Sequence, residues 1–141
     1  MKAYLAIKFH ADYSDKKLIE DISNALQKID VVTVVMVRDF ERWGEVKFTP
    51  QELMQKSFVE LDKSDFLIIE YSEKGVGLGI EAGYAYAKNI PIFVIAKANS
   101  EISDTVKGIA KSTFFYNDPV EITKNSEFIK LAGGRRASTE S

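Results

Sequence analysis

The segment best suited to chemistry is Gly-Val-Gly-Leu-Gly-Ile-Glu-Ala-Gly, at residues 75–83. The alternating glycines Gly75, Gly77 and Gly79 let the backbone approach a ligand closely, and the helix expected to start after them favours a negative charge. Glu81 falls in the first turn of that predicted helix. There the macrodipole and the free amide groups are expected to keep its carboxylate ionised at neutral pH. An ionised carboxylate at the mouth of a crevice can act as a nucleophile.

The same segment has other interpretations. Glycine loops recur on many folds, so these residues can simply form a tight turn with Glu81 as a capping charge. Gly77-x-Gly79-x-x-Ala82 loosely fits a dinucleotide fingerprint, but it follows the third predicted strand instead of the first, and Lys97 stands where an acidic residue is needed. No Gly-Lys-Ser/Thr follows the glycines, so a Walker phosphate loop is absent. No nicotinamide cofactor is therefore expected.

Composition limits the chemistry further. The 141 residues contain no cysteine, one histidine (His10), 19 Lys and Arg, and 21 Asp and Glu, for a formal net charge of −2. Thiolate nucleophiles and zinc clusters built on Cys or His are thereby excluded. The chain therefore lacks the excess of positive charge that is typical of proteins that bind a nucleic-acid polymer or an anionic membrane. The longest apolar runs are strand-sized and no signal peptide is evident, so a soluble cytoplasmic protein is predicted.

Strand and helix patterns alternate along the chain. This order is typical of an α/β fold with parallel strands and right-handed crossovers, and here it predicts a flavodoxin-like or Rossmann-like three-layer domain with a five-stranded parallel sheet. The expected strands are Lys2–Lys8, Val31–Arg38, Asp65–Tyr71, Pro91–Lys97 and Ser112–Tyr116. In such sheets ligands bind at the carboxyl ends of the strands, so the loops after Lys8, Arg38 and Tyr71 are the expected site.

Helix starts are marked by capping residues. Ser14 is the expected N-cap of the first helix, and Thr49-Pro50-Gln51-Glu52 forms a capping box with proline at the first helical position. The third helix is expected to open after Gly75–Gly79 and run to about Lys88. A shorter one is expected near Ser103–Ala110, and a fifth begins at Asp118-Pro119. Residues 1–131 are expected to form one domain and residues 132–141 a disordered tail.

Gly77-Leu78-Gly79-Ile80-Glu81-Ala82-Gly83, preceded by the strand at residues 64–70, resembles the signature of the nucleoside 2-deoxyribosyltransferase superfamily, and most closely its 2′-deoxynucleoside 5′-monophosphate N-glycosidases. The resemblance implies a flavodoxin-like domain that forms homodimers or higher homo-oligomers and needs no cofactor. It also implies that Glu81 is the nucleophile and that Tyr4, in the first strand, orients it.

Three positions depart from that pattern. The family carries an Asp on the helix before the central strand that assists proton transfer, and here Ser57 stands there. Ser57 lies on the inward stripe of its helix and can hydrogen-bond a sugar or base, but it is a poor general acid. The phosphate-binding branch has a Ser and an Arg after the first strand, where this chain has Lys8 and His10. Lys8, with His10 or Arg38 at the end of the second strand, is expected to hold the 5′ end of a nucleotide. Alternatively, each of these residues is simply a solvated cation on the surface.

The connection at residues 39–48 is unusually aromatic. Phe40, Trp43 and Phe48 can form a lid whose flat rings stack on a nucleobase, or they can plug the edge of the core or an interface.

Taken together, the sequence predicts an enzyme that breaks or transfers the N-glycosidic bond of a (deoxy)nucleoside or its 5′-monophosphate through a covalent intermediate on Glu81. The predicted substrate contacts are Lys8, His10, Arg38, Ser57, Gly75, Gly77 and Gly79. Because Ser57 replaces the acid, a non-catalytic nucleotide-binding or signalling module of the same fold is the alternative. A phosphoribohydrolase is disfavoured, because its motif has a Thr before the Glu where this chain has Ile80.

Overall fold

The computed structural model describes residues 1–125, 127–128 and 130. Its sheet has five strands, all paired in parallel, in the order β2-β1-β3-β4-β5. The strands are β1 (Lys2–Ile7), β2 (Val32–Val34), β3 (Phe66–Glu70), β4 (Ile92–Lys97) and β5 (Ser112–Tyr116). The predicted α/β fold is therefore confirmed. The strand order reverses between β1 and β3, which is where a sheet of this kind opens a crevice for ligands.

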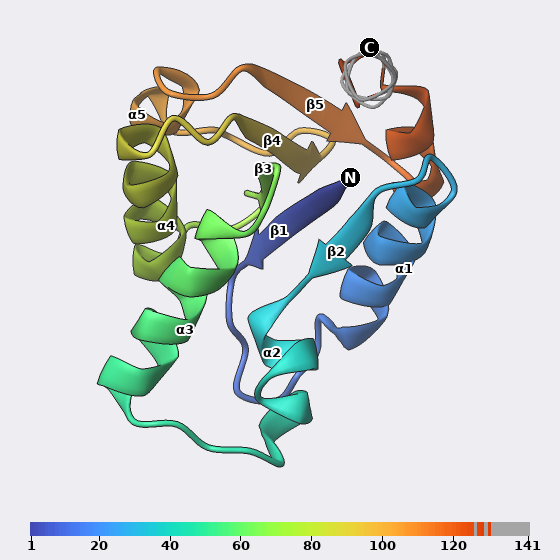
Figure 1. The fold of residues 1–141 in the computed structure, drawn as a ribbon. Coiled ribbons are helices and arrows are strands. Elements are labelled where there is room, and N and C mark those ends of the chain that lie inside the picture. The colour runs from blue at the N-terminus through green and yellow to red at the C-terminus, as the bar shows by residue number, and fades with distance from the viewer. Residues whose placement is uncertain (126, 129, 131–141) are drawn as a thin grey trace, which may run out of the picture.

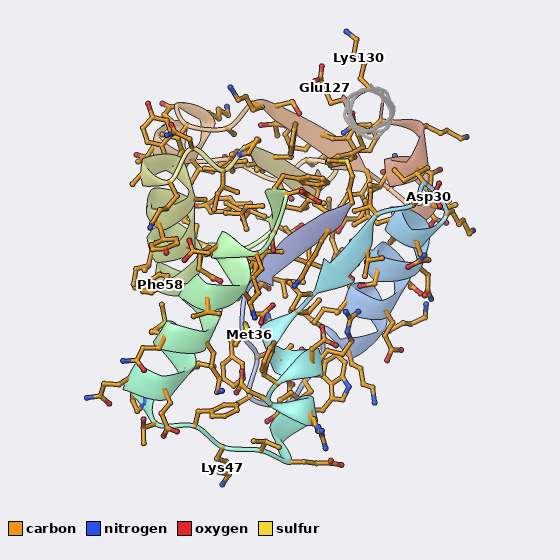
Figure 2. All side chains as sticks on the ribbon, in the orientation of Figure 1. Asp30, Met36, Lys47, Phe58, Glu127 and Lys130 are labelled. Carbon is orange, nitrogen blue, oxygen red and sulfur yellow. The ribbon has the colours of Figure 1, made fainter. Side chains whose placement is uncertain are left out.

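Helices cover both faces of the sheet, as Figure 1 shows. The α-helices are α1 (Lys16–Gln27), α2 (Met36–Asp39), α3 (Pro50–Asp62), α4 (Val76–Ala87) and α5 (Asp104–Lys107), and the 3₁₀ helices are η1 (Arg42–Gly44) and η2 (Pro119–Lys124). One core cluster joins the sheet to α3, α4 and α5, and the other joins it to α1 and η2. Side chains fill the space between the layers (Figure 2).

Side-chain alternation along β1 decides what reaches the site. Ala3 and Leu5 enter the core on the α1 side, whereas Tyr4 and Ala6 enter the core beneath α3 and α4. Successive residues of a strand point to opposite faces, so this assignment follows directly from the register. Tyr4 is thereby directed to the face that carries the glycine-rich helix.

The second strand is shorter than predicted, because the chain leaves the sheet after Val34 and forms α2. The Asp39 carboxylate accepts a hydrogen bond from the Val35 backbone N–H at 2.8 Å, which replaces the bond that a continuing strand would have made. Val35 and Met36 still enter opposite cores, so the apolar run looks like a strand in the sequence although it turns into a helix.

Two predicted helix starts also need correction. Ser14 does not cap the first helix: its N–H binds the Asp12 carboxylate at 3.0 Å, and Asp15 occupies the N-cap position without a side-chain bond. The third predicted helix, α4, begins at Val76 with Gly75 as its N-cap. Gly77 and Gly79 therefore lie inside the helix, and Glu81 falls in its second turn.

Other expectations hold. Thr49 and Glu52 form the predicted capping box of α3, with proline at its start, and Ser103 caps the short α5. The fifth helix begins at Pro119 as predicted but is a 3₁₀ helix. Among the described residues, no helix has the length and apolar character needed to cross a membrane. The predicted tail at 132–141, and the last residue of the predicted domain, lie outside the described part of the chain.

Candidate active site

A pocket of about 450 Å³ opens at the carboxyl end of β1, beside the start of α4. Its walls come from the end of β1 and the loop after it, the first turns of α1, the α2–η1 segment, the middle of α3 and the first turns of α4. The pocket thus lies at the reversal of strand order between β1 and β3, as the fold predicts. A volume of this size is within the usual range for small-molecule sites.

Glu81 lies on the pocket wall and is half-buried. Burial raises the pKa of its carboxyl group to about 7, and a hydrogen bond with Tyr4 acts in the opposite direction. The helix terminus therefore does not hold the pKa of this group in its ordinary range, contrary to the expectation from the sequence. Glu81 sits one turn too far along α4 for the free N–H groups to dominate, so desolvation decides its charge.

Tyr4 is fully buried beneath Glu81. Its hydroxyl is hydrogen-bonded to Glu81 and lies beside the Ser57 hydroxyl, and burial together with the nearby carboxylate raises the pKa of the phenol. A neutral phenol is a fixed hydrogen-bond donor, so Tyr4 is suited to orient and stabilise the Glu81 carboxylate.

Ser57 is also buried and lines the pocket from α3, as its helical position predicts. Its hydroxyl donates to the Leu53 carbonyl oxygen at 3.1 Å. The Ser57 hydroxyl proton is therefore engaged in a hydrogen bond within α3 and does not point to a ligand.

The predicted cations occupy different environments. Lys8 lines the pocket and packs its aliphatic stem near Gly75, where an added Cβ would meet Lys8 Cδ at 3.2 Å. His10 also lines the pocket, but its Nε2 lies 2.7 Å from a Glu73 carboxylate oxygen and 3.2 Å from one of Asp15. His10 is thus held by two acidic side chains, a partnership that would compete with a bound phosphate.

Arg38 does not reach the pocket. Its guanidinium donates to the Ser23 hydroxyl, to the carbonyl and hydroxyl oxygens of Thr33, and to the carboxylate of Asp39, at 2.8–3.2 Å. Because β2 ends at Val34, Arg38 lies on α2 and turns back toward α1 instead of projecting from a strand end. Its predicted role in substrate binding is not supported by this placement.

Of the three predicted glycines, two line the pocket and one does not. Gly75 and Gly77 line the pocket, and a Cβ on Gly77 would lie 3.9 Å from Glu81 Oε1. Gly79 is not among the residues that line it, and a Cβ there would have no neighbour within 4 Å. Of the three, only Gly77 borders the Glu81 carboxyl group.

The aromatic segment contributes both to the core and to the pocket wall. Phe40 packs against the core on the α3 side, whereas Trp43 lines the pocket and also contacts the core on the α1 side. The Lys16 ammonium lies 5.1 Å from the Trp43 ring. Arg42, Trp43 and Gly44 all have positive φ, of 47°, 56° and 93°, and this tight turn directs the indole inward.

A buried carboxylate supports the loop that leads into α4. Glu70, at the end of β3, accepts hydrogen bonds from the Ser72 N–H at 2.7 Å, from the Ser72 hydroxyl at 2.9 Å and from the Tyr116 hydroxyl. Ser72 in turn accepts from the Lys97 N–H at 2.9 Å. This network ties the ends of β3, β4 and β5 together beside the pocket.

Sequence reasoning missed several pocket residues, most notably Glu41, which precedes η1 and lines the pocket. No motif or periodicity marks Glu41, and its only signal is its place between Phe40 and Trp43 in the aromatic segment. Within the described residues, no group of three or more His, Asp or Glu side chains is arranged to hold a metal ion.

No protein-family model matches the chain. A protein of Thermofilum pendens, named provisionally as 2′-deoxynucleoside 5′-phosphate N-hydrolase 1, is 26% identical over 117 residues, covering 81% of this chain and 82% of that protein. The resemblance to the nucleoside 2-deoxyribosyltransferase superfamily is confirmed. The expectation that the chain is an enzyme agrees with the name of this relative.

Solved structures of the superfamily share the fold. A 2-deoxyribosyltransferase from Bacillus psychrosaccharolyticus has a TM-score of 0.74 at 15% identity, with 93% of this chain and 96% of that chain covered. A CMP N-glycosidase from Clostridium botulinum has a TM-score of 0.63 at 16% identity, with 90% and 98% covered. At these identities the structural likeness concerns the fold alone.

Proposed function

We propose that this protein is an enzyme that cleaves the N-glycosidic bond of a nucleoside or a nucleoside 5′-monophosphate, and passes the sugar to water or to a second base. The observation that carries the proposal is the placement of Glu81 on the wall of the pocket, with its carboxylate hydrogen-bonded to the buried phenol of Tyr4. The name of the Thermofilum pendens relative supports the same class of reaction.

In the proposed reaction, an oxygen of the ionised Glu81 carboxylate attacks the anomeric carbon of the sugar. The bond from that carbon to the base breaks, and its electron pair leaves with the base. The resulting glycosyl ester is then opened by water or by a second base, with net retention of configuration. The Tyr4 hydroxyl holds the carboxylate in place and stabilises its ionised form.

The 5′ end of the sugar is proposed to lie near Lys8 and the Gly75–Gly77 backbone at the start of α4. The first N–H groups of this helix have no partner within the helix and face the pocket region, so they can bind oxygen atoms of the ligand. Lys8 would add a positive charge for a 5′-phosphate. His10 would contribute only by exchanging one of its carboxylate partners for the ligand.

The test is base release, followed by chromatography, from a panel of ribo- and deoxyribonucleosides and their 5′-monophosphates. Wild type is compared with Glu81→Gln and Glu81→Ala, and with Glu20→Gln as a control, since Glu20 is exposed on α1 and lies outside the pocket. We expect release by wild type and the control, and loss in both Glu81 variants. Each reaction is repeated with a second free base, so that transfer is distinguished from hydrolysis. No product in either format would contradict the proposal.

The placement of Ser57 where the family has an acid favours a second candidate, a non-catalytic module that binds a nucleotide. Calorimetric binding of a nucleotide without base release or base exchange, unchanged in Glu81→Gln, would support this candidate over the enzyme.

A further inference from the structure

A departing base needs a proton, and the residues assigned so far do not supply one. The phenol of Tyr4 is buried, and its pKa is raised, which makes it a weak acid that serves as a hydrogen-bond donor to Glu81. The Ser57 hydroxyl already donates to the Leu53 carbonyl oxygen, and a hydroxyl is a poor acid at neutral pH. The pocket therefore holds a nucleophile but lacks an assigned acid.

Three carboxyl side chains line the pocket: Asp15, Glu41 and Glu81. Asp15 is engaged with His10 at 3.2 Å, and Glu81 is engaged with Tyr4. Glu41 has no hydrogen-bond or ion-pair partner for its carboxyl group among the residues that the structure describes. It is half-buried, and burial raises the pKa of its carboxyl group, which favours the protonated form.

The backbone holds Glu41 in a defined position. Its N–H donates to the Met36 carbonyl at 3.0 Å, and its own carbonyl accepts from the N–H groups of Gly44 and Val46, each at 3.0 Å. The tight left-handed turn that follows brings the Trp43 ring to the same pocket. A planar base stacked on this indole would lie close to the segment that carries Glu41.

We propose that Glu41 is the acid that protonates the leaving base, and that it replaces the Asp that the family carries at the position of Ser57. This inference rests on the proposed function. As the bond from the anomeric carbon to the base breaks, the electron pair moves onto the base, and a base nitrogen takes the proton of the Glu41 carboxyl group. The Glu41 carboxylate then regains a proton from the water, or from the N–H of the acceptor base, that opens the glycosyl ester on Glu81.

The bound base itself would favour this proton transfer. It displaces water from Glu41, which raises the pKa of the carboxyl group further, and its ring nitrogen accepts a hydrogen bond only from the protonated form. The other charged groups that line the pocket are Lys8, His10, Asp15, Lys16 and Glu81. Of these, Lys16 stands over the Trp43 ring, and His10 and Asp15 neutralise each other when the imidazole is protonated.

The experiment compares wild type, Glu41→Gln and Glu45→Gln on the nucleosides or nucleotides that wild type cleaves. Glu45 is exposed in the same segment and outside the pocket, so it is a matched control. We expect Glu41→Gln to lower kcat by about 10²–10⁴-fold, the usual contribution of a general acid, and Glu45→Gln to leave it unchanged. Glutamine has nearly the shape of glutamate, so unchanged thermal unfolding is expected for both variants.

A 7-methyl-2′-deoxyguanosine substrate separates proton donation from binding, because its cationic base leaves as a neutral molecule without gaining a proton. Glu41→Gln should cleave it within a few-fold of wild type, whereas Glu81→Gln should not. The pH profile on the ordinary substrate gives an independent readout: the fall in kcat at alkaline pH should disappear in Glu41→Gln.

Several results would overturn this role for Glu41. Full activity in Glu41→Gln would do so while leaving the proposed glycosidase or transferase function intact, as would an equal loss on the methylated and ordinary substrates. If wild type does not accept the methylated substrate, an alkaline limb that persists in Glu41→Gln would decide against the role. Absence of base release or exchange by wild type on every substrate would instead remove the proposed function, and this inference with it.

Discussion

The hydroxyl of Tyr4 is hydrogen-bonded to the carboxyl group of Glu81, although the two residues belong to β1 and α4. The side-chain alternation of β1 directs Tyr4 toward the helices above it, and α4 places Glu81 on the pocket wall. Burial alone would favour the protonated, unreactive form of this carboxyl group. The bond from Tyr4 opposes that effect and leaves the pKa of Glu81 at about 7. A small change in this balance therefore changes the fraction of reactive carboxylate near neutral pH.

The first prediction concerns pH. Since the proposed nucleophile must be ionised and the pKa of Glu81 is about 7, kcat/KM should fall about tenfold per unit as the pH drops below 7. Tyr4→Phe removes the hydrogen bond that stabilises the carboxylate, so the acidic limb should move up by about 1 pH unit. The measurement is a pH profile of base release for both proteins. An acidic limb at the same pH in Tyr4→Phe would contradict this role for Tyr4.

The second prediction concerns two glycines of α4. In Gly77→Ala the new methyl group would lie 3.9 Å from Glu81 Oε1, in the space that the sugar must enter, so activity should fall by about tenfold or more. Gly79→Ala is the matched control, because its methyl group meets nothing within 4 Å. That variant should keep its activity and gain about 0.5–1 kcal/mol in free energy of unfolding from the helix propensity of alanine. Equal effects of the two substitutions on activity would argue against the assigned geometry.

The third prediction separates Arg38 from the pocket. Its guanidinium bridges α2 to Ser23 and Thr33, so Arg38→Ala should lower the free energy of unfolding by about 1–2 kcal/mol, as measured with urea. KM should not change for nucleosides or for their 5′-monophosphates. A selective rise in KM for the monophosphates would show instead that Arg38 binds the phosphate, as the sequence alone suggested.

The fourth prediction uses Trp43, the single tryptophan of the chain. Because its ring lines the pocket, a base that stacks on it should quench the intrinsic fluorescence in a saturable way when a substrate is titrated into the inactive Glu81→Gln variant. Trp43→Ala should weaken binding by about 1–3 kcal/mol, the usual range for a base stacked on an aromatic side chain, and Trp43→Phe by less. Saturable binding with unchanged fluorescence would place the base elsewhere in the pocket.

Much of this architecture could be predicted because it depends on local signals. Apolar strands, the Thr49 capping box and the alternation of strands with helices are visible in short windows of sequence, and they specify a parallel α/β sheet. The glycine motif likewise pointed to Glu81 and, through the resemblance, to Tyr4, and both residues line the pocket. The second strand was misjudged because Val35 and Met36 enter opposite cores whether the chain continues as a strand or turns into a helix.

By itself, then, the sequence determined the fold class, the helix that carries the proposed nucleophile and the sheet edge at which the pocket opens. Only the tertiary structure decided how each ionisable group behaves there. Glu81 is desolvated by residues distant in the chain, and His10 is paired with Asp15 and Glu73. Arg38 binds Ser23, whereas Glu41 lines the pocket. Burial and pairing are set by contacts between segments far apart in the sequence, and these contacts exist only once the layers have packed.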